Sequence, residues 1–450
     1  MLENYQIIKK IFFIYIFFLS FFAFLFPKNN PTIWHLIFQG GQAIAIFIMG
    51  YFLFQRDRGI LYFTAGIAVY LFFNILLYRF FNYYMYGNWI GLPGGDGYGY
   101  VKIAEDFVDK GYSLFYLNEY FESKQIMLDD YGMYSLASII FYVLGRDWGY
   151  HLLPFVSIIP ILAGGLLLKR MGLSLGIEKE HSYLLYFLWS TMTFACYDSS
   201  VALKENYMSF LVIASSYFLL QISFKPSFIK CFCFLFLAST LLFFRTAIFY
   251  MLIICFITAL ILRLDMFGKN FWLWLSFSIF TIVPMFPVVI NYIGDVRGGV
   301  SIDFVNNVYD TKISEAGVFA PILNILAAFI GPIPSFLSGD EFKVKYMTLF
   351  SFSSTIKILI SFGYLYTLYY AIRNKVLELI PIIMIIIFNS LMLIVLFYTL
   401  HDRYQWPQYP LVLLLAIYGF ERYKKSNGKW FKYYCYLVIL FIMIFNLRVV

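Results

Sequence analysis

Residues 379–400 read LIPIIMIIIFNSLMLIVLFYTL, an apolar run that contains no charged side chain. A helix needs about 20 consecutive apolar residues to cross the hydrocarbon core of a bilayer, so this run predicts a membrane-spanning helix. Residues 11–26 and 272–290 have the same character. Of the 450 residues, 62% are hydrophobic and only 13% are charged, against about 25% charged in a soluble domain. This composition excludes a soluble enzyme, a nucleic-acid-binding domain and a disordered chain.

Similar runs along the chain predict an all-α polytopic membrane protein, with residues 1–450 forming a single integral membrane domain. We expect about thirteen membrane-spanning helices. They cover roughly 11–26, 33–54, 60–82, 149–168, 182–197, 206–222, 227–244, 246–262, 271–291, 346–370, 376–400, 407–420 and 431–449. Two long segments, about 83–148 and 292–345, mix aromatic, glycine and charged residues, and we interpret them as large loops that carry short helices.

Two apolar stretches inside these loops, residues 134–144 and 318–330, are too short to cross a bilayer. A helix of about 11 residues is only about 16 Å long, whereas the hydrocarbon core is about 30 Å thick. We therefore expect re-entrant or interfacial helices there. With the N-terminus in the cytoplasm, more than half of the 33 lysines and arginines then lie on the inner side, as the positive-inside rule requires. Both long loops and most of the polar turns consequently lie on the outer face of the cell (inner) membrane.

The first outer loop contains a carboxylate on a glycine-rich turn, in the sequence GLPGGDGYGYVKIA over residues 91–104. Asp96, Tyr100 and Ala104 are four residues apart, so they share one face if this segment is helical. One interpretation makes Asp96 the N-cap of that helix. The other makes it a general base for a substrate hydroxyl, with Tyr100 beside the substrate and backbone N–H groups of the glycines free to approach a phosphate.

A second acidic turn, YDSSVALKE over residues 197–205, lies between two predicted spans on the same face. Acids beside a membrane helix are costly and commonly functional. Glu205 would be favourable at a helix start for electrostatic reasons alone. The functional alternative makes Asp198 and Glu205 further catalytic carboxylates that orient Lys204, bind the acceptor, or hold a divalent cation together with Asp96. No cofactor other than that possible cation is indicated.

Isolated cations follow in later outer turns. Arg245 stands between two apolar runs, and Arg403 follows His401 and Asp402 at the outer end of a span. Arg245 would be either a helix-end charge that reaches the interface or a bidentate ligand for a phosphate. The segment around Arg403 would be either an interfacial aromatic belt in which Arg403 pairs with Asp402, or a second phosphate clamp. In the second interpretation Arg403 binds the phosphate, and His401 is a substrate-binding residue that titrates near neutral pH. Arg297 belongs to the second outer loop, which we interpret as a candidate lid with a further phosphate-binding arginine.

The spacing Asp96-x3-Tyr100-x3-Ala104, followed by Gly111, resembles the GT-C superfamily of membrane glycosyltransferases. This superfamily includes protein O-mannosyltransferases and the lipid A aminoarabinose transferase. The second acidic turn and the late pattern Arg403-Tyr404-x2-Pro407-x2-Pro410 are similar too. The resemblance covers roughly residues 60–420 as sparse motifs.

The resemblance implies an inverting hexosyl- or pentosyltransferase with Asp96 as its catalytic carboxylate. Such an enzyme moves a sugar from a polyprenyl-phosphate donor, at the outer or periplasmic face, to a glycan, lipid or protein acceptor of the cell envelope. Two other classes remain open. An O-antigen or capsule repeat-unit polymerase would depend on loop arginines, and a lipid-linked glycan transporter would favour charges inside the membrane and internal repeats.

Overall fold

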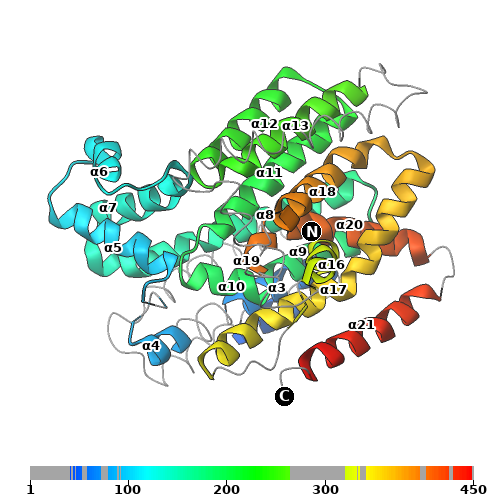
Figure 1. Cartoon of the computed structure of the whole chain (residues 1–450), viewed down its shortest axis with the longest axis horizontal. Helices are drawn as coiled ribbons and strands as arrows, with labels where there is room; N and C mark the ends of the chain where they lie inside the picture. The colour runs from blue at the N-terminus through cyan, green and yellow to red at the C-terminus, as the bar shows by residue number, and fades with distance from the viewer. Residues whose placement is uncertain are drawn as a thin grey trace. The chain divides into compact units, whose positions relative to one another are not determined.

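The computed structural model describes residues 41, 44–45, 47–52, 58–71, 80–88, 91, 93–263, 320–331, 333–334, 341–395, 402–424 and 429–447. Every regular element in these ranges is a helix (Figure 1), which confirms the all-α expectation for the described part of the chain. The chain divides into two compact units. Unit 1 comprises Met1–Ile126, Tyr131–Lys169 and Glu178–Tyr207, and unit 2 comprises Met127–Asp130, Arg170–Ile177 and Met208–Val450.

Unit 1 contains the first long loop and the helices on either side of it. Its elements are α3 (Arg58–Leu71), α4 (Phe80–Tyr86), α5 (Asp96–Asp109), η2 (Leu114–Tyr116), α6 (Leu117–Ser123), α7 (Tyr131–Val156), most of α8 (Ile158–Ser174), α9 (Lys179–Ser190) and α10 (Thr193–Ser200). The loop is therefore a helical structure rather than an extended connection.

An aromatic core holds this loop together. Phe107 of α5 packs against Tyr120 and Phe121 of α6, and all three side chains are at most 1% exposed. The rings of Phe107 and Tyr120 meet edge to face at 5.2 Å between centroids. Aromatic side chains bury large areas and favour such geometry, so the loop has a hydrophobic core of its own.

Helix α7 is interrupted at Gly145, where the backbone is not helical (φ 77°, ψ 172°). A positive φ of this kind is readily adopted by glycine alone. The helical segment 131–144 therefore ends at Gly145, close to where the apolar stretch 134–144 is expected to end. Its 14 residues span about 21 Å, less than a bilayer core.

The predicted span over residues 182–197 is divided in the structure. Helix α9 ends at Ser190, Met192 is extended (φ −61°, ψ 125°), and α10 begins at Thr193. Apolar periodicity did not reveal this break because no glycine or proline marks it. The 12 residues of α9 span about 18 Å, which is shorter than a bilayer core.

Unit 2 contains the remaining helices. They are η3 (Leu128–Asp130), α11 (Glu205–Phe224), α12 (Phe228–Thr240), η4 (Leu241–Phe243), α13 (Thr246–Arg263), α16 (Ala320–Ile330), α17 (Glu341–Asn374), η6 (Leu377–Leu379), α18 (Ile380–Val395), α19 (Asp402–Gln405), α20 (Tyr409–Lys424) and α21 (Trp430–Leu447), with the first turn of α11 assigned to unit 1. Helix α16 falls within the short apolar stretch 318–330 and ends just before Gly331, as the sequence predicts.

Helices α17 and α20 pack closely through two glycines. A Cβ on Gly363 would lie 2.3 Å from the carbonyl oxygen of Ala416, and one on Gly419 would lie 2.0 Å from the carbonyl oxygen of Gly363. Small residues at such a crossing let two backbones approach each other, as in many membrane helix pairs.

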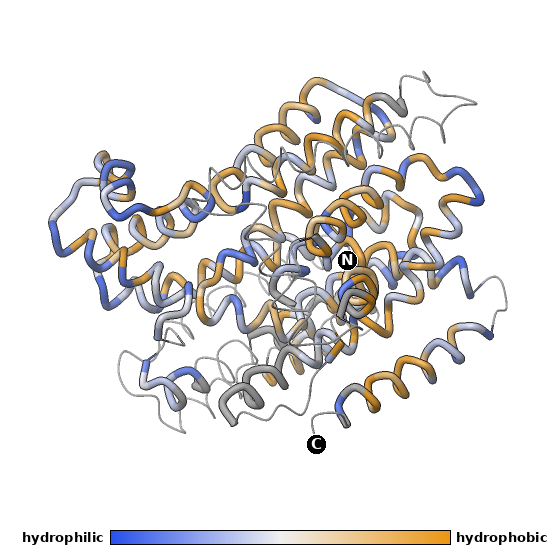
Figure 2. Tube along the Cα trace, viewed as in Figure 1, coloured by the Kyte–Doolittle hydropathy of each residue, from blue (hydrophilic) through white to orange (hydrophobic). Residues whose placement is uncertain are grey.

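Four helical stretches in the described residues are long and apolar enough to cross a membrane: Leu128–Ser174, Glu205–Phe224, Ser353–Asn374 and Leu377–Ile394. Shorter apolar helices cover Phe228–Phe243, Thr246–Leu260 and Trp430–Ile444. Helices α12, α13 and α21 are predominantly apolar along their length (Figure 2). The spans predicted at 11–26 and 271–291 lie outside the described residues.

Candidate functional site

Asp96 is the first residue of α5, which confirms the helix expected from the spacing of Asp96, Tyr100 and Ala104. Gly95 occupies the N-cap position and no side chain caps the helix, so the N-cap interpretation of Asp96 does not describe the structure. Tyr100 and Ala104 are buried, whereas the Asp96 side chain is exposed. A carboxylate in the first turn is favoured by the helix dipole and is here open to solvent.

The start of α5 lies directly against the second acidic turn. A Cβ on Gly97 would lie 2.1 Å from the carbonyl oxygen of Val201, and one on Gly91 would lie 2.7 Å from Val201 Cγ1. Glycine is required at position 97 because any side chain would collide with backbone. The structure thus brings together two polar turns that are about 100 residues apart in the sequence.

Backbone hydrogen bonds hold the second turn between α10 and α11. The amide of Leu203 donates to the carbonyl of Asp198 at 2.8 Å, and Ala202 has the left-handed conformation (φ 54°). Asn206 Nδ2 donates to the carbonyl of Ala195 at 3.2 Å and to Ser199 Oγ at 2.7 Å. The turn is therefore rigid on the side that faces α10.

The charged residues of this turn are buried: Asp198 is 0%, Lys204 5% and Glu205 1% exposed. Buried charges are tolerated when charges of both signs and hydrogen bonds balance them. Two carboxylates and one ammonium are enclosed in this turn, so the acids exceed the base by one. Among the predicted acids Asp96 is thus the accessible one, while Asp198 and Glu205 form a buried polar layer in the adjoining turn.

Arg245 lies in unit 2, immediately before α13; the residue is half-buried, and its guanidinium carbon is 5.6 Å from the centroid of the Tyr404 ring. A guanidinium over an aromatic ring is stabilised by the ring quadrupole. The next residue, Thr246, donates its amide to Asp129 Oδ1 at 3.0 Å, and its hydroxyl also bonds that oxygen. Asp129 is 3% exposed. The carboxylate of a distant loop thus caps α13 beside Arg245.

The turn that follows α18 contacts a second cation, which the sequence analysis did not single out. Lys357 of α17 is 2% exposed and hydrogen-bonds to Gln405 Oε1. Its Nζ lies 5.8 Å from the centroid of the Tyr409 ring. Gln405 Nε2 donates to the carbonyl of Ala327 at 2.8 Å, which ties α19 to α16. A lone lysine inside an otherwise apolar predicted span was the signal available for Lys357.

The remaining predicted residues are described less fully. Arg403 lies in α19, and its side chain is outside the described part of the structure. His401 and Arg297 are outside the described residues. In the part of the second long loop that is described, α16 is bonded to α18 through Asn324 Nδ2 and the carbonyl of Ile394 at 2.8 Å. This helix is thus a fixed part of unit 2.

A polar network stabilises the first loop behind the candidate site. The Asp106 carboxylate accepts from Lys124 at 2.8 Å, from the Tyr120 hydroxyl at 2.7 Å and is 3.1 Å from Lys110. These donors, Lys124 first, hold the pKa of Asp106 well below its usual value. Burial, together with the bond to Asp106, raises the pKa of Tyr120. The network is structural because it makes α5 and α6 one body.

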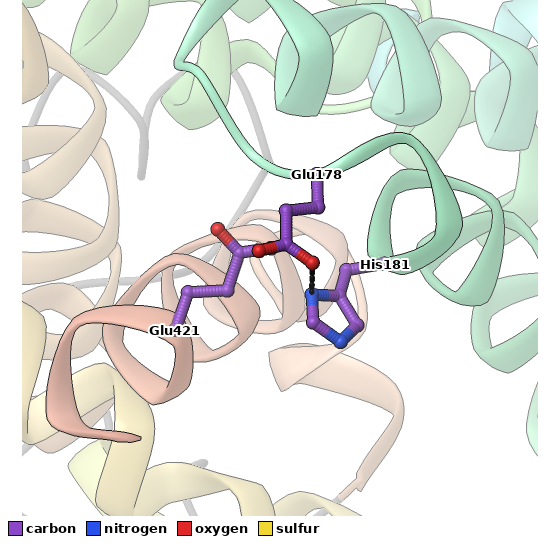
Figure 3. A group of neighbouring side chains, drawn as sticks. All are labelled: Glu178, His181 and Glu421. Carbon is purple, nitrogen blue, oxygen red and sulfur yellow. Dashed lines mark ion pairs between the residues drawn. The ribbon is translucent and has the colours of Figure 1, made fainter. Parts of the chain in front are cut away.

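An acid–histidine pair, Glu178 and His181, lies at the start of α9. His181 Nδ1 is 3.7 Å from a carboxylate oxygen of Glu178 (Figure 3). The side chains are 37% and 71% exposed. An exposed pair of this kind contributes little stability, and we assign it no role in the candidate site.

No protein-family model, curated protein or solved structure matches this chain.

Proposed function

We propose that the chain is a multi-pass membrane glycosyltransferase of the GT-C type, which moves a sugar from a polyprenyl-phosphate donor to a cell-envelope acceptor. The active site would lie on the outer face, as the distribution of basic residues requires. The observation that carries this proposal is the contact of Gly97 with the Val201 carbonyl. Through it an exposed carboxylate, Asp96, adjoins a turn that contains two buried carboxylates and a lysine.

In the proposed reaction Asp96 takes the proton of an acceptor hydroxyl, whose oxygen attacks the anomeric carbon of the sugar. The bond from that carbon to the phosphate oxygen breaks, and the polyprenyl phosphate leaves with the electron pair. Inversion follows because the attack is opposite the leaving group. General-base catalysis of this kind contributes about 10²–10⁴-fold. Asp198 and Glu205 supply carboxylate oxygens, the ligands that divalent cations prefer, should the reaction use one.

The charge that develops on the departing phosphate needs cations. Arg245, which the sequence analysis selected for this role, is half-buried beside Tyr404. Arg403, in the adjoining α19, is the second candidate for the same role. A guanidinium matches the geometry of phosphate oxygens. Apolar helices would hold the polyprenyl chain.

The test compares lipids and surface glycans by mass spectrometry in cells with the wild-type protein, a deletion, Asp96→Asn and Glu119→Gln. Glu119 is an exposed acid of the same loop and serves as the matched control. We expect the deletion and Asp96→Asn to lose one sugar-sized mass increment and to accumulate the unmodified acceptor. A normal glycan profile for Asp96→Asn, beside an altered deletion strain, would contradict the proposal.

The buried Lys357 in α17 favours a second candidate, a transporter of lipid-linked glycans, because a charge inside a membrane helix commonly marks a transport path. If the protein is a transporter, its deletion would leave every sugar attached and trap the complete lipid-linked glycan on the inner leaflet. If it is a polymerase, its deletion would instead reduce a ladder of long glycans to single repeat units. The same spectra therefore separate the three classes.

A further inference from the structure

The turn that contains α19 contacts two cations of unit 2, one from the segment just before α13 and one from α17. Arg245 approaches the ring of Tyr404, and Lys357 bonds the side chain of Gln405, the next residue along the chain. Arg245 is half-buried, whereas Lys357 is 2% exposed. The two cations therefore differ in role: one can meet a ligand, and the other is enclosed by protein.

The amide of Gln405 has a fixed orientation. Its oxygen accepts from Lys357, so its nitrogen points to the carbonyl of Ala327, to which it donates at 2.8 Å. Gln405 itself is 1% exposed. An ammonium has three donors and no acceptor, and it consequently permits only this orientation of the amide. Lys357, Gln405 and Ala327 join α17, α19 and α16 at one point.

The ring of Tyr409 supports the same arrangement from the other end of the turn. It lies 5.8 Å from Lys357 Nζ and stacks on Trp406 at 5.3 Å between centroids. Trp406 and Tyr409 are each 3% exposed. Lys357 thus lies against both Gln405 and Tyr409, the residues on either side of the turn 406–408, and Gln405 directly follows Tyr404.

We propose that Lys357 is a positioning residue for an anion site at Arg245, which binds the phosphate of a polyprenyl-phosphate lipid. Lys357 fixes Gln405, Gln405 fixes the α19 turn, and the Tyr404 ring of that turn orients the Arg245 guanidinium. This inference rests on the proposed function for the identity of the anion. It goes beyond that proposal because Lys357 acts without touching the ligand.

The test measures binding rather than transfer. Native mass spectrometry of the full-length protein gives the Kd for undecaprenyl phosphate, with the uncharged undecaprenol as the second probe. We expect Arg245→Met and Lys357→Met each to weaken phosphate binding tenfold or more. Binding of undecaprenol should change less than twofold in both variants. Ser361→Ala is the matched control, because it removes a buried hydroxyl of α17, which bonds the carbonyls of Lys357 and Ile330, and leaves the Lys357 charge in place.

A double-mutant cycle distinguishes positioning from direct contact. If Lys357 acts through Gln405, the double variant of Lys357→Met and Gln405→Leu should bind undecaprenyl phosphate as weakly as Gln405→Leu alone, since coupled residues are not additive. Additive losses would instead indicate a direct contact and would overturn the positioning role. Should Lys357→Met not fold, Gln405→Leu still tests the chain of contacts, because wild-type affinity in that variant also overturns it.

Failure of this inference is distinguishable from failure of the proposed function. Wild-type phosphate affinity in Lys357→Met, or an equal loss for undecaprenol, overturns the inference and leaves the Asp96→Asn experiment untouched. A different result would be a normal glycan profile in Asp96→Asn together with the expected losses of phosphate binding in Arg245→Met and Lys357→Met. That result would contradict the proposed transferase function and support the phosphate-binding site.

Discussion

Gly97 of α5 lies against Val201 of the second acidic turn, where an added Cβ would lie 2.1 Å from the Val201 carbonyl oxygen. Real Cβ atoms do not come this close to backbone, so position 97 determines how near α5 lies to the turn over residues 198–205. The relationship makes the placement of Asp96 sensitive to a single methyl group.

Gly97→Ala should therefore displace the start of α5 and reduce sugar transfer at least tenfold, because small errors in the position of a catalytic group are costly. Transfer by membranes and the helix content of the purified protein measure the two effects separately. Gly99→Ala is the control: its Cβ would meet only the Tyr134 hydroxyl, at 3.6 Å. Equal activity of the two variants would show that the contact does not position Asp96.

Acid should loosen the first loop through Asp106. Its pKa is lowered in the folded protein, so its stabilising contribution is present above the unfolded pKa of about 3.9 and is lost as the pH falls below it. The hydrogen-exchange protection factors of α5 and α6, compared at pH 7 and pH 3, measure this change. The carboxylate is 36% exposed, so the expected effect is below about 1 kcal/mol.

Asp106→Asn should remove most of that pH dependence, because an amide does not titrate. The comparison is Glu122→Gln. Glu122 is an exposed acid of α6, and among the contacts described its carboxylate bonds only Asn118. If the wild-type loop has the same hydrogen-exchange protection factors at both pH values, the assignment of Asp106 as its acid-sensitive group is contradicted.

The packing of α17 on α20 should not tolerate a methyl group at Gly419, since a Cβ there would lie 2.0 Å from the Gly363 carbonyl. We expect Gly419→Ala to lower stability by about 1–3 kcal/mol, the usual cost of overpacking. Thermal unfolding in detergent measures this loss. Gly331→Ala is milder because its Cβ would meet the Ile358 side chain, which can rotate. A larger loss for Gly331→Ala would refute the backbone contact.

The segment 131–144 should contact lipid through its exposed apolar side chains. In the structure, Tyr142 is 47% exposed and Val143 is 65% exposed. A nitroxide attached to Val143→Cys should be more accessible to oxygen than to a water-soluble nickel complex. A nitroxide attached to Glu119→Cys, at an exposed position of α6, should show the reverse. Equal accessibility of the two sites would place the segment in water.

The sequence predicted the helical class because it depends on local periodicity, and the four-residue spacing of Asp96, Tyr100 and Ala104 agrees with the helix that contains them. It did not predict the break at Met192, where no glycine or proline interrupts the apolar run. It also could not reveal the partners of Lys357 and Asp129. Those contacts join residues 48 and 117 positions apart, and only tertiary packing determines such pairs.

The bond between Asp129 and the start of α13 also orders events in time. Residue 129 leaves the ribosome 117 residues before Thr246 does, an interval of roughly 6–23 s at ordinary rates of synthesis. During that interval Asp129 cannot cap α13, because Thr246 has not yet been synthesised, and residues 127–130 cannot reach their final packing. The late synthesis of α13 thus completes a part of unit 2 that begins with residues 127–130, and a pause in translation just before Thr246 would prolong that interval.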